Sequence, residues 1–301
     1  MTSTKKAVLI TGCTPGGIGH SLALTFHSRG YNVLASARSR SKIVDLAELG
    51  ITTLALDVTD ITSIEMARTE VEGMIERGEM GGLDVLVNNA GRNCTMPALD
   101  VDLNDARACF ETNVFGVMAM CQVFTPLLIR RKGLIVNIGS VAAILPYIFG
   151  STYNASKAAL HAYSRTLRLE LAPFSVRVMV VITGGVQSNI ARVQRILPPT
   201  SLYLEIEDEF RKRVVHSQEG AMSNQVYAEG VVDTVAEGGR RTLWRGRRSW
   251  VVWFVRKWVG SWVFDVVLPG MFGLRRLGGL VRGRESLRVE DGNGEKGEKG
   301  L

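Results

Sequence analysis

The chain has 301 residues, of which 46% are apolar and 22% are charged, and this balance excludes intrinsic disorder over most of its length. The net charge of +7 comes from one part of the chain. Residues 240–288 contain twelve Lys and Arg and two acidic residues, whereas the charges of all other residues sum to −3. The four cysteines form no C-x-x-C pair and no metal-like spacing, so we expect a reduced, intracellular protein without a metal site.

Short apolar segments alternate with amphipathic ones over the first 180 residues. The expected strands are AVLIT, NVLASA, TLALD, LDVLVNNAG, GLIVNIGS and VRVMVVITGG. Continuous apolar runs are typical of strands buried on both faces of a parallel sheet. Helices are expected between them, over residues 18–29, 61–77, 105–131 and 153–172, with an interruption near Pro126. We therefore predict a doubly wound, Rossmann-like α/β fold of about seven parallel strands with helices on both faces, and a ligand at the carboxyl ends of the strands.

The second half of the chain is less regular. Residues 188–227 have mixed polarity, contain Pro198 and Pro199 and show no strand pattern, so we predict a substrate lid. Residues 226–237 are predicted as a helix and residues 240–245 as an edge strand, which ends a catalytic domain spanning residues 1–248. An apolar and basic helical extension follows, and residues 275–301 are predicted to be basic and then disordered over the last dozen positions.

The basic stretch also contains all five tryptophans of the chain. A basic stretch alone is typical of nucleic-acid binding, but arginine mixed with tryptophan fits a membrane interface better, so we expect no nucleic-acid partner. Residues 249–274 are apolar except for three charges, which interrupt the roughly 18–20 residues that a spanning helix needs. We expect a membrane-interface segment, with two alternatives: a helix packed on its own domain or a dimer partner, and a kinked spanning helix.

The stretch TGCTPGGIGH lies between the first expected strand and the first helix. A glycine turn in this position lets backbone amides approach a pyrophosphate, and the helix dipole assists. Its spacing does not fit the G-x-G-x-x-G pattern, and Gly12, Gly17 and Gly19 are the three glycines that we align with a phosphate-binding turn. In this alignment the loop is one residue longer than the usual pattern, and we expect it to bulge at Pro15 and Gly16.

The stretch YNASK carries the main catalytic signal. Tyr153 and Lys157 are four residues apart on a predicted helix and so share one face. A nearby ammonium favours the phenolate, which moves a tyrosine toward use as a general acid or base near neutrality. Ser140 ends the fifth expected strand at the same rim, where its hydroxyl can polarise a carbonyl group. Asn113 is expected to hold a water that joins Lys157 to solvent.

Together with NNAG at residues 88–91, these motifs resemble the short-chain dehydrogenase/reductase superfamily in their order along residues 7–190. The resemblance implies an oxidoreductase with Ser140, Tyr153 and Lys157 as its catalytic triad and Asn113 as a fourth member. It also implies a nicotinamide cofactor that contacts Gly12, Thr14, Gly17, Ile18, Gly19, Arg38, Asp57, Val58, Asn89, Ala90, Gly91, Tyr153, Lys157, Val186 and Ser188.

Two features depart from the family pattern. The glycine motif is one residue longer than usual, and Thr183-Gly184 stands where the family has Pro-Gly. Thr183 loses the fixed φ of proline, although Val186 and Ser188 still match the segment that packs on the nicotinamide. Asp57 is the residue that would meet the adenine in this resemblance.

The end of the second expected strand indicates which nicotinamide cofactor is used. An NAD enzyme has an acidic residue there to bind the ribose 2′-hydroxyl. This chain has Ser36, Ala37 and Arg38, with Arg40 nearby. A guanidinium suits a phosphate, and no acidic group in this stretch repels one, so we predict NADP(H).

A closer resemblance, over residues 7–245, is to the fungal NADPH-dependent 1-acyl-dihydroxyacetone phosphate reductases. It rests on GRNCTMPALD, TNVFG, FGSTYNASKAALHAY, APFSVRV, ITGGV and LPPTSLY. It implies lipid biosynthesis at the cytosolic face of the endoplasmic reticulum or at lipid droplets, with a small-molecule or lipid ketone as substrate; otherwise the protein is cytoplasmic. The alternatives are a ketoreductase of fungal secondary metabolism, for a polyketide or terpenoid ketone, and a non-enzymatic NADPH-binding regulator. The superfamily resemblance implies a homodimer or homotetramer.

Three further residues are candidates for substrate contact. Cys94 lies where it can line the substrate mouth, or it is a small buried filler. Arg192 and Arg195, in the expected lid, are candidates for a substrate phosphate, the alternative being solvated loop charges. His161 lies on the helix of Tyr153, and we expect it to pack rather than to act in catalysis.

Overall fold

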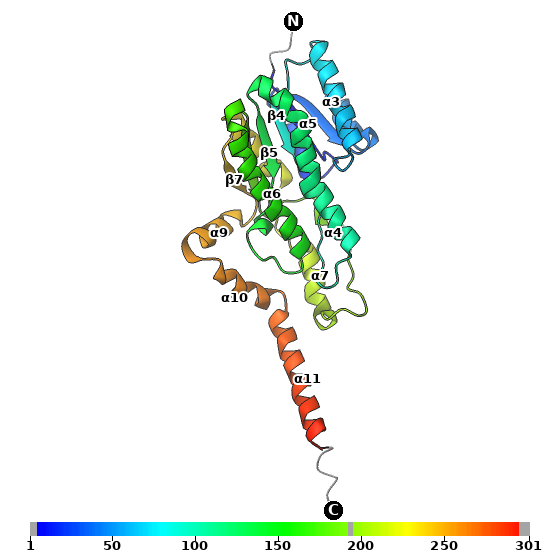
Figure 1. Cartoon of the computed structure of the whole chain (residues 1–301), viewed down its shortest axis with the longest axis vertical. Helices are drawn as coiled ribbons and strands as arrows, with labels where there is room; N and C mark the ends of the chain where they lie inside the picture. Colours follow the sequence, from blue (N-terminus) through cyan, green and yellow to red (C-terminus); the bar gives the residue numbers. More distant parts are fainter. Residues whose placement is uncertain (1–4, 192–194, 295–301) are drawn as a thin grey trace, which may run out of the picture.

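The computed structural model describes residues 5–191 and 195–294 and contains a seven-stranded parallel sheet in the order β3-β2-β1-β4-β5-β6-β7 (Figure 1). The strands are β1 (Ala7–Ile10), β2 (Asn32–Ala37), β3 (Thr52–Ala55), β4 (Val85–Asn88), β5 (Leu134–Ile138), β6 (Arg177–Thr183) and β7 (Thr242–Arg245). The strand order reverses between β1 and β4, which opens a crevice at the carboxyl edge where ligands bind in such sheets. The predicted Rossmann-like fold and the edge strand are confirmed.

Helices cover both faces of the sheet. The helices of the domain are α1 (Ile18–Ser28), α2 (Val44–Glu48), α3 (Ile61–Glu76), α4 (Leu103–Phe110), α5 (Gly116–Arg131), α6 (Ser151–Glu170), α7 (Glu207–Val215) and α8 (Asn224–Ala236). On one face, Phe26 of α1 and Tyr227 of α8 are fully buried in a shared core. On the other, α3, α5 and α6 bury Ile64, Phe124 and Leu160 (Figure 1). Apolar burial on both faces explains the nearly continuous apolar strands.

The helix expected over residues 105–131 is interrupted at a different place. Pro126 lies inside α5, which continues to Arg131. The break is a π-helical turn, Glu111–Phe115, between α4 and α5. Single π-turns widen a helix and often mark functional sites. Here the turn directs the Asn113 side chain to Arg92 and Ser156, away from α5. The interruption predicted at Pro126 is therefore wrong in position.

The predicted lid region contains a helix that its irregular composition concealed. Residues 188–227 include the short 3-10 turns Asn189–Ala191 and Leu204–Ile206 and then α7. The first turn of α7 carries three acidic residues, which the helix dipole favours. Ile206 and Phe210 are fully buried and attach this segment to the domain. Arg192, a predicted substrate residue, lies outside the described residues.

The C-terminal extension folds back onto the domain. It consists of α9 (Ser249–Phe254), a π-helical turn (Val255–Val259), α10 (Trp262–Met271) and α11 (Leu274–Gly294). Val252, Phe264, Leu268 and Phe272 are buried in a third apolar cluster, so the packed alternative holds for one face of residues 249–274. In Figure 1, α11 extends away from the domain. The described chain ends at Gly294 within α11, and the disorder predicted for the last dozen residues stays a prediction.

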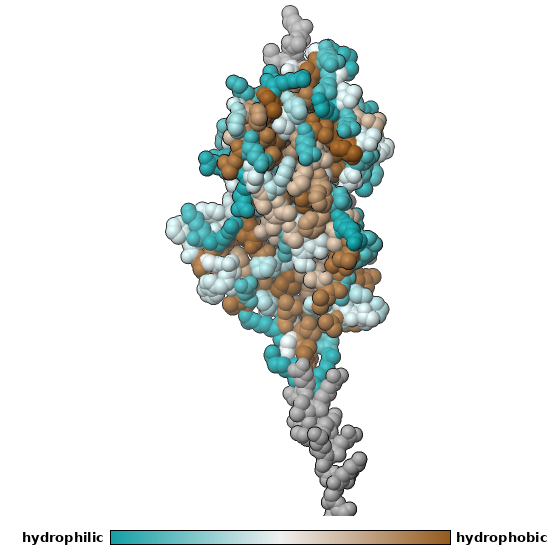
Figure 2. All heavy atoms as spheres, in the orientation of Figure 1, coloured by the Kyte–Doolittle hydropathy of each residue, from teal (hydrophilic) through white to brown (hydrophobic). Residues whose placement is uncertain are grey.

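The opposite face of this extension is exposed and apolar. Trp250, Trp258 and Trp262 are 68%, 65% and 60% exposed. Figure 2 shows apolar and pale residues gathered over the half of the molecule that holds α9 and α10. Within the described ranges, one helical stretch is long and apolar enough to span a membrane, and it is the half-buried core stretch Leu103–Arg131. The helices of residues 249–274 have six and ten residues, whereas a spanning helix needs about 20.

Candidate active site

The glycine turn after β1 is held tightly against the end of β4. The Asn89 side-chain amide donates to the carbonyl oxygens of Thr11 and Gly12 at 2.8 and 3.1 Å. A Cβ at Gly19 would lie 2.4 Å from the Gly12 oxygen, so only glycine lets α1 approach the turn. Gly16 has φ +75°, and Gly17 is the N-cap of α1. Gly16 therefore lies in a left-handed bend before the helix that Gly17 begins, and the one-residue insertion relative to the family stays a prediction.

A cavity of about 1380 Å³ runs along the carboxyl edge of the sheet from this turn to α10. Twelve of the cofactor candidates that precede or follow the catalytic helix line it: Gly12, Thr14, Gly17, Ile18, Arg38, Asp57, Val58, Asn89, Ala90, Gly91, Val186 and Ser188. Gly19 does not line the cavity and instead packs behind Gly12. The Oδ1 atom of Asn189, in the same wall, is buried without a hydrogen-bond partner among the described residues. The close backbone approach fits a bound dinucleotide.

The two arginines after β2 have different surroundings. Arg40 forms two hydrogen bonds with the Glu70 carboxylate, at 2.6 and 2.7 Å. Arg38 lines the cavity and forms no ion pair with any residue in the described part of the chain. The free guanidinium is therefore the one that faces the site, as required for binding a 2′-phosphate.

The catalytic candidates meet in the middle of this cavity. Ser140 follows β5 in an extended conformation, and Tyr153 and Lys157 lie on α6. Lys157 Nζ donates to the Ile138 carbonyl at 2.9 Å and lies 5.9 Å from the centroid of the Tyr153 ring. All three side chains line the cavity. The structure therefore brings the predicted triad together.

The effect of Lys157 on the pKa of Tyr153 differs from the expectation. Burial raises the pKa of Tyr153 to about 12, while contact with Ser140 and the charge of Arg213 oppose this rise. Lys157 is not among the groups that lower the pKa of Tyr153, and its ammonium donates to the Ile138 carbonyl. Burial also lowers the pKa of Lys157 to about 8. The expected lowering of the Tyr153 pKa by Lys157 is thus not seen, and Tyr153 stays protonated at neutral pH.

Asn113 is fully buried and supports the site from behind. Its amide donates to the Arg92 carbonyl and to Ser156 Oγ at 2.9 and 3.0 Å, and its Oδ1 accepts from the Arg92 N–H at 2.8 Å. It does not line the cavity. A Cβ at Gly91 would lie 3.4 Å from Asn113 Oδ1 and 3.8 Å from Lys157 Nζ, so the two residues share one neighbourhood. Its predicted water-binding role stays a prediction.

His161 has a role that the expectation of simple packing missed. Its Nε2 accepts the backbone N–H of Ser140 at 3.2 Å. Burial, followed by the charges of Lys157, Arg165 and Arg256, lowers the pKa of His161 to about 4, so the ring is neutral and able to accept at neutral pH. We therefore regard His161 as a positioning residue for Ser140. The sequence offered one signal for this role: His161 lies eight residues after Tyr153 on the same helix, which places both on one face.

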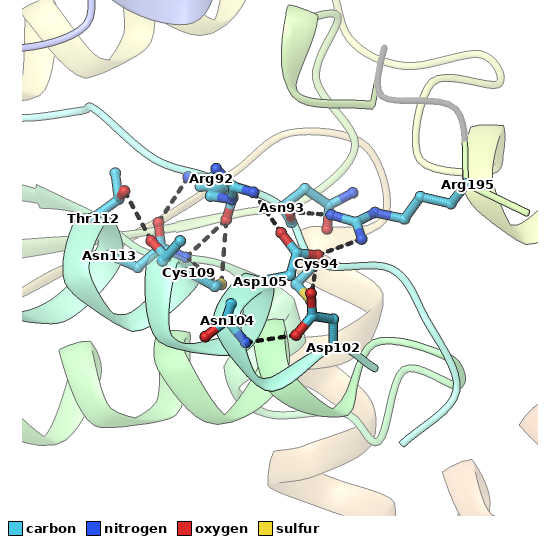
Figure 3. Close-up of polar contacts among 11 residues, drawn as sticks. Arg92, Asn93, Cys94, Asp102, Asn104, Asp105, Cys109, Thr112, Asn113 and Arg195 are labelled. Carbon is cyan, nitrogen blue, oxygen red and sulfur yellow. Dashed lines mark hydrogen bonds and ion pairs between the residues drawn. The ribbon is translucent and has the colours of Figure 1, made fainter. Parts of the chain in front are cut away.

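The remaining substrate candidates belong to an ion-pair network (Figure 3). Asp105 binds both Arg92 and Arg195, and Arg195 also donates to the Asn93 carbonyl at 3.2 Å. Although burial acts to raise it, these arginines lower the pKa of Asp105 to about 2. Cys94 is buried, donates to Asp105 and does not line the cavity, as expected of a filler. Arg195 lines the cavity with its charge already neutralised.

The far end of the cavity has walls that motif analysis did not assign to the site. They come from the β5–α6 loop, α7 and the C-terminal extension and include Leu145, Tyr147, Arg213, His216, Arg248, Val251, Val252, Phe264, Val267, Leu268 and Met271. We call these residues the cap. The spacing of Ile206, Phe210 and Arg213, which places an arginine on the apolar face of α7, was a signal that the sequence offered.

The comparisons with known proteins agree with this geometry. Residues 6–196 match the short chain dehydrogenase family. The chain belongs to this family. It is therefore an oxidoreductase, and the triad at the carboxyl edge occupies the place where the family's fold holds its site.

Individual relatives extend the match over different lengths. An NADPH-dependent 1-acyldihydroxyacetone phosphate reductase of Schizosaccharomyces pombe is 46% identical over 205 residues, which is 66% of this chain and 68% of that protein. A short-chain dehydrogenase of Neurospora crassa is 39% identical over 278 residues, covering 91% of this chain and 94% of that one. The crystal structure of a short-chain dehydrogenase from Streptomyces avermitilis superposes with a TM-score of 0.72 at 26% identity, covering 93% of this chain and 98% of that chain.

Proposed function

We propose that this short-chain dehydrogenase reduces the ketone of 1-acyl-dihydroxyacetone phosphate to the alcohol of 1-acyl-glycerol 3-phosphate. The cofactor is NADP(H), in keeping with the free Arg38 guanidinium and with the NADPH dependence named for the S. pombe relative. The observation that carries the proposal is a complete triad placed between a dinucleotide-binding wall and an apolar cap in one continuous cavity. A cavity of about 1380 Å³ exceeds the roughly 300–1,000 Å³ of ordinary small-ligand sites, which suits a cofactor together with an acyl chain.

The side chains of the triad divide the work of carbonyl reduction. Bound NADPH supplies the hydride that the ketone carbon gains. Ser140 Oγ donates a hydrogen bond to the carbonyl oxygen, and Tyr153 gives that oxygen its proton. Burial raises the pKa of Tyr153 to about 12, so the hydroxyl carries its proton at neutral pH. Lys157, whose Nζ donates to the Ile138 carbonyl in the cavity wall, would hold the ribose of the bound cofactor.

The experiment that tests this function measures NADPH oxidation with 1-dodecanoyl-dihydroxyacetone phosphate and identifies the product by mass spectrometry. We expect NADPH-dependent formation of 1-dodecanoyl-glycerol 3-phosphate. If NADPH binds but this ketone is not reduced, while other ketones are, the proposed substrate is wrong and the reductase assignment stands. If no ketone in a broad panel is reduced, the non-enzymatic NADPH-binding regulator becomes the better account.

The alternative is a ketoreductase of fungal secondary metabolism that acts on a polyketide or terpenoid ketone. The match to the S. pombe reductase leaves about a third of this chain uncovered, whereas the N. crassa short-chain dehydrogenase aligns over 91% of it. That longer match includes part of the C-terminal extension, which supplies much of the cap. A panel of neutral polycyclic and aromatic ketones, assayed beside the acyl phosphate, separates the two proposals.

We also propose that the exposed face of α9 and α10 contacts a membrane surface, consistent with action at the endoplasmic reticulum or a lipid droplet. Val251, Val267 and Met271 are exposed and also line the cavity, so the apolar face continues into the substrate end. Trp250, Trp258 and Trp262 of the same extension are exposed, and tryptophan favours the headgroup region. A lipid ketone would enter the cavity from this face without crossing water. The homodimer or homotetramer expected from the superfamily remains a prediction.

A further inference from the structure

The cap contains a buried charge that the proposed chemistry does not use. Arg213, at the end of α7, is only 4% exposed, yet it lines the cavity. No carboxylate among the described residues forms an ion pair with it. A buried guanidinium without a counter-ion is costly, because its lost hydration is not replaced by a charged partner. Such a residue indicates a ligand that supplies the missing negative charge.

The surroundings of Arg213 fix the direction of its free donors. Its Nε donates to the Ile148 carbonyl at 2.8 Å, and its guanidinium carbon lies 3.4 Å from the centroid of the Tyr147 ring. Neither terminal nitrogen has a hydrogen-bond partner in the part of the chain that the structure describes. The stem is therefore held by a carbonyl and an aromatic face, while the terminal nitrogens remain available to the cavity. This arrangement presents the planar fork that recognises phosphate and carboxylate oxygens.

A second arginine and a histidine lie in the same wall. The exposed Arg248 lines the cavity. Burial raises the pKa of Tyr147, and the charges of Arg213 and Arg248 oppose this rise. Burial lowers the pKa of His216, and the same two charges add to the lowering. Tyr147 and His216 are joined by a hydrogen bond of 2.5 Å. Glu219 also lines the cavity and partly opposes these charges, but it forms no ion pair with either arginine among the described residues. The cap end thus carries an excess of positive charge.

We propose that Arg213 and Arg248 bind an anionic group of the substrate, a phosphate attached one carbon from the ketone. The proposed anion site rests on the proposed reductase function. It assigns phosphate binding to Arg213 and Arg248 instead of Arg195, because the Arg195 guanidinium is paired with the Asp105 carboxylate. A Cβ built at Gly150, the N-cap of α6, would lie 3.2 Å from the Arg213 Nη2 atom, and Tyr153 lies three residues further along in the same cavity wall, so the anion site is close to the reacting carbonyl. A phosphate beside the ketone meets this requirement, with its acyl chain against the apolar residues of α9 and α10. A phosphate at the far end of a long chain does not.

The test compares two substrates that differ only in the anion: 1-dodecanoyl-dihydroxyacetone phosphate and 1-dodecanoyl-dihydroxyacetone. For the wild-type protein we expect kcat/KM to be about 10- to 100-fold higher for the phosphate, because charge-assisted hydrogen bonds contribute about 1.5–3 kcal/mol. Arg213→Gln should bring this ratio close to one, mainly through KM for the phosphate. Arg248→Gln, at an exposed position, should lower the ratio less and guards against misfolding of the first variant.

Arg211→Gln is the matched control, because Arg211 lies on the same helix, faces solvent and pairs with Glu207. It should retain the wild-type ratio. A wild-type ratio near one, or a ratio unchanged by both Arg213→Gln and Arg248→Gln, would overturn the anion site even if the reductase function holds.

A second measurement does not depend on turnover of either ketone. In the presence of NADP⁺, calorimetry compares binding of 1-dodecanoyl-glycerol 3-phosphate with that of 1-dodecanoylglycerol. Tighter binding of the phosphate that Arg213→Gln abolishes supports the anion site even when the proposed substrate is not reduced. Equal affinity for the two compounds contradicts it.

Discussion

The two ends of the cavity are built from different materials. At the cofactor end, the walls are glycine backbone, small side chains and polar groups joined in a network, as Asn89 joins the glycine turn to β4. At the cap end, the walls are aromatic and aliphatic side chains with arginines that lack acidic partners among the described residues. The first construction positions a ligand of fixed shape through its phosphates, and the second accepts an apolar ligand with one charged group.

This difference separates what the family determines from what this chain determines. The cofactor end and the triad lie within residues 6–196, the region that matches the family. Most of the cap lies beyond it, on α7, α9 and α10. Changes at the cofactor end should therefore affect every substrate equally, whereas changes in the cap should discriminate among substrates.

The largest effect is expected at the boundary between the two ends. Tyr153→Phe removes the proton donor and should lower kcat by about 10²–10⁴-fold, the usual contribution of general acid catalysis. NADPH affinity, measured by fluorescence titration, should change little. Tyr31→Phe, a tyrosine that packs on Phe26 away from the cavity, is the control and should retain activity. A kcat of Tyr153→Phe equal to that of the wild type would contradict the mechanism.

A charge reversal at the cofactor end should come next. Arg38→Glu places a carboxylate where the 2′-phosphate is expected and should reduce kcat/KM for NADPH by about 100-fold, with a smaller loss for NADH. Arg40→Ala removes a guanidinium already bound to Glu70 and should have a much smaller effect. Equal losses for the two variants would mean that Arg38 does not select the cofactor.

A change on the outer face of the cap should affect membrane binding without affecting the fold. Replacing Trp250, Trp258 and Trp262 together with serine removes exposed apolar area and should weaken binding to anionic lipid vesicles by about tenfold or more. The control replaces Leu49, Met66 and Leu99, which are similarly exposed on the domain, with serine. If both triple variants bind vesicles as the wild type does, the membrane contact is elsewhere or absent.

The smallest effect concerns stability. The pKa of His161 is lowered from 6.5 to about 4 in the folded protein, chiefly by burial. Because the unfolded chain takes up this proton first, the contribution of His161 is complete above pH 6.5 and is lost as the pH falls toward 4. Urea unfolding of His161→Gln should show a shallower decline over this range than the wild type. The exposed His27→Gln should match the wild type, and equal slopes for all three proteins would contradict the assignment.

The sequence predicts the sheet and triad well because their signals are local. Apolar runs mark strands, and the spacing of Tyr153 and Lys157 places them on one face of a helix. The cap is different, because its residues come from segments more than a hundred positions apart, such as Tyr147 and Phe264. Hydrophobic periodicity predicts local secondary structure and does not indicate which distant segments come into contact. For the same reason the pairing of Arg195 with Asp105, and the resulting choice of Arg213 as the free arginine, required the folded structure.

The central claim is hydride transfer from NADPH to a ketone carbon at this triad, and isotope transfer tests it most directly. NADPH that carries deuterium at the transferred position is incubated with 1-dodecanoyl-dihydroxyacetone phosphate, and the product is analysed by mass spectrometry. We predict an alcohol with one deuterium on the carbinol carbon from the wild-type protein, and the same product formed at least about 100-fold more slowly by Tyr153→Phe. Product without deuterium, or deuterated product at the wild-type rate from Tyr153→Phe, would contradict the account.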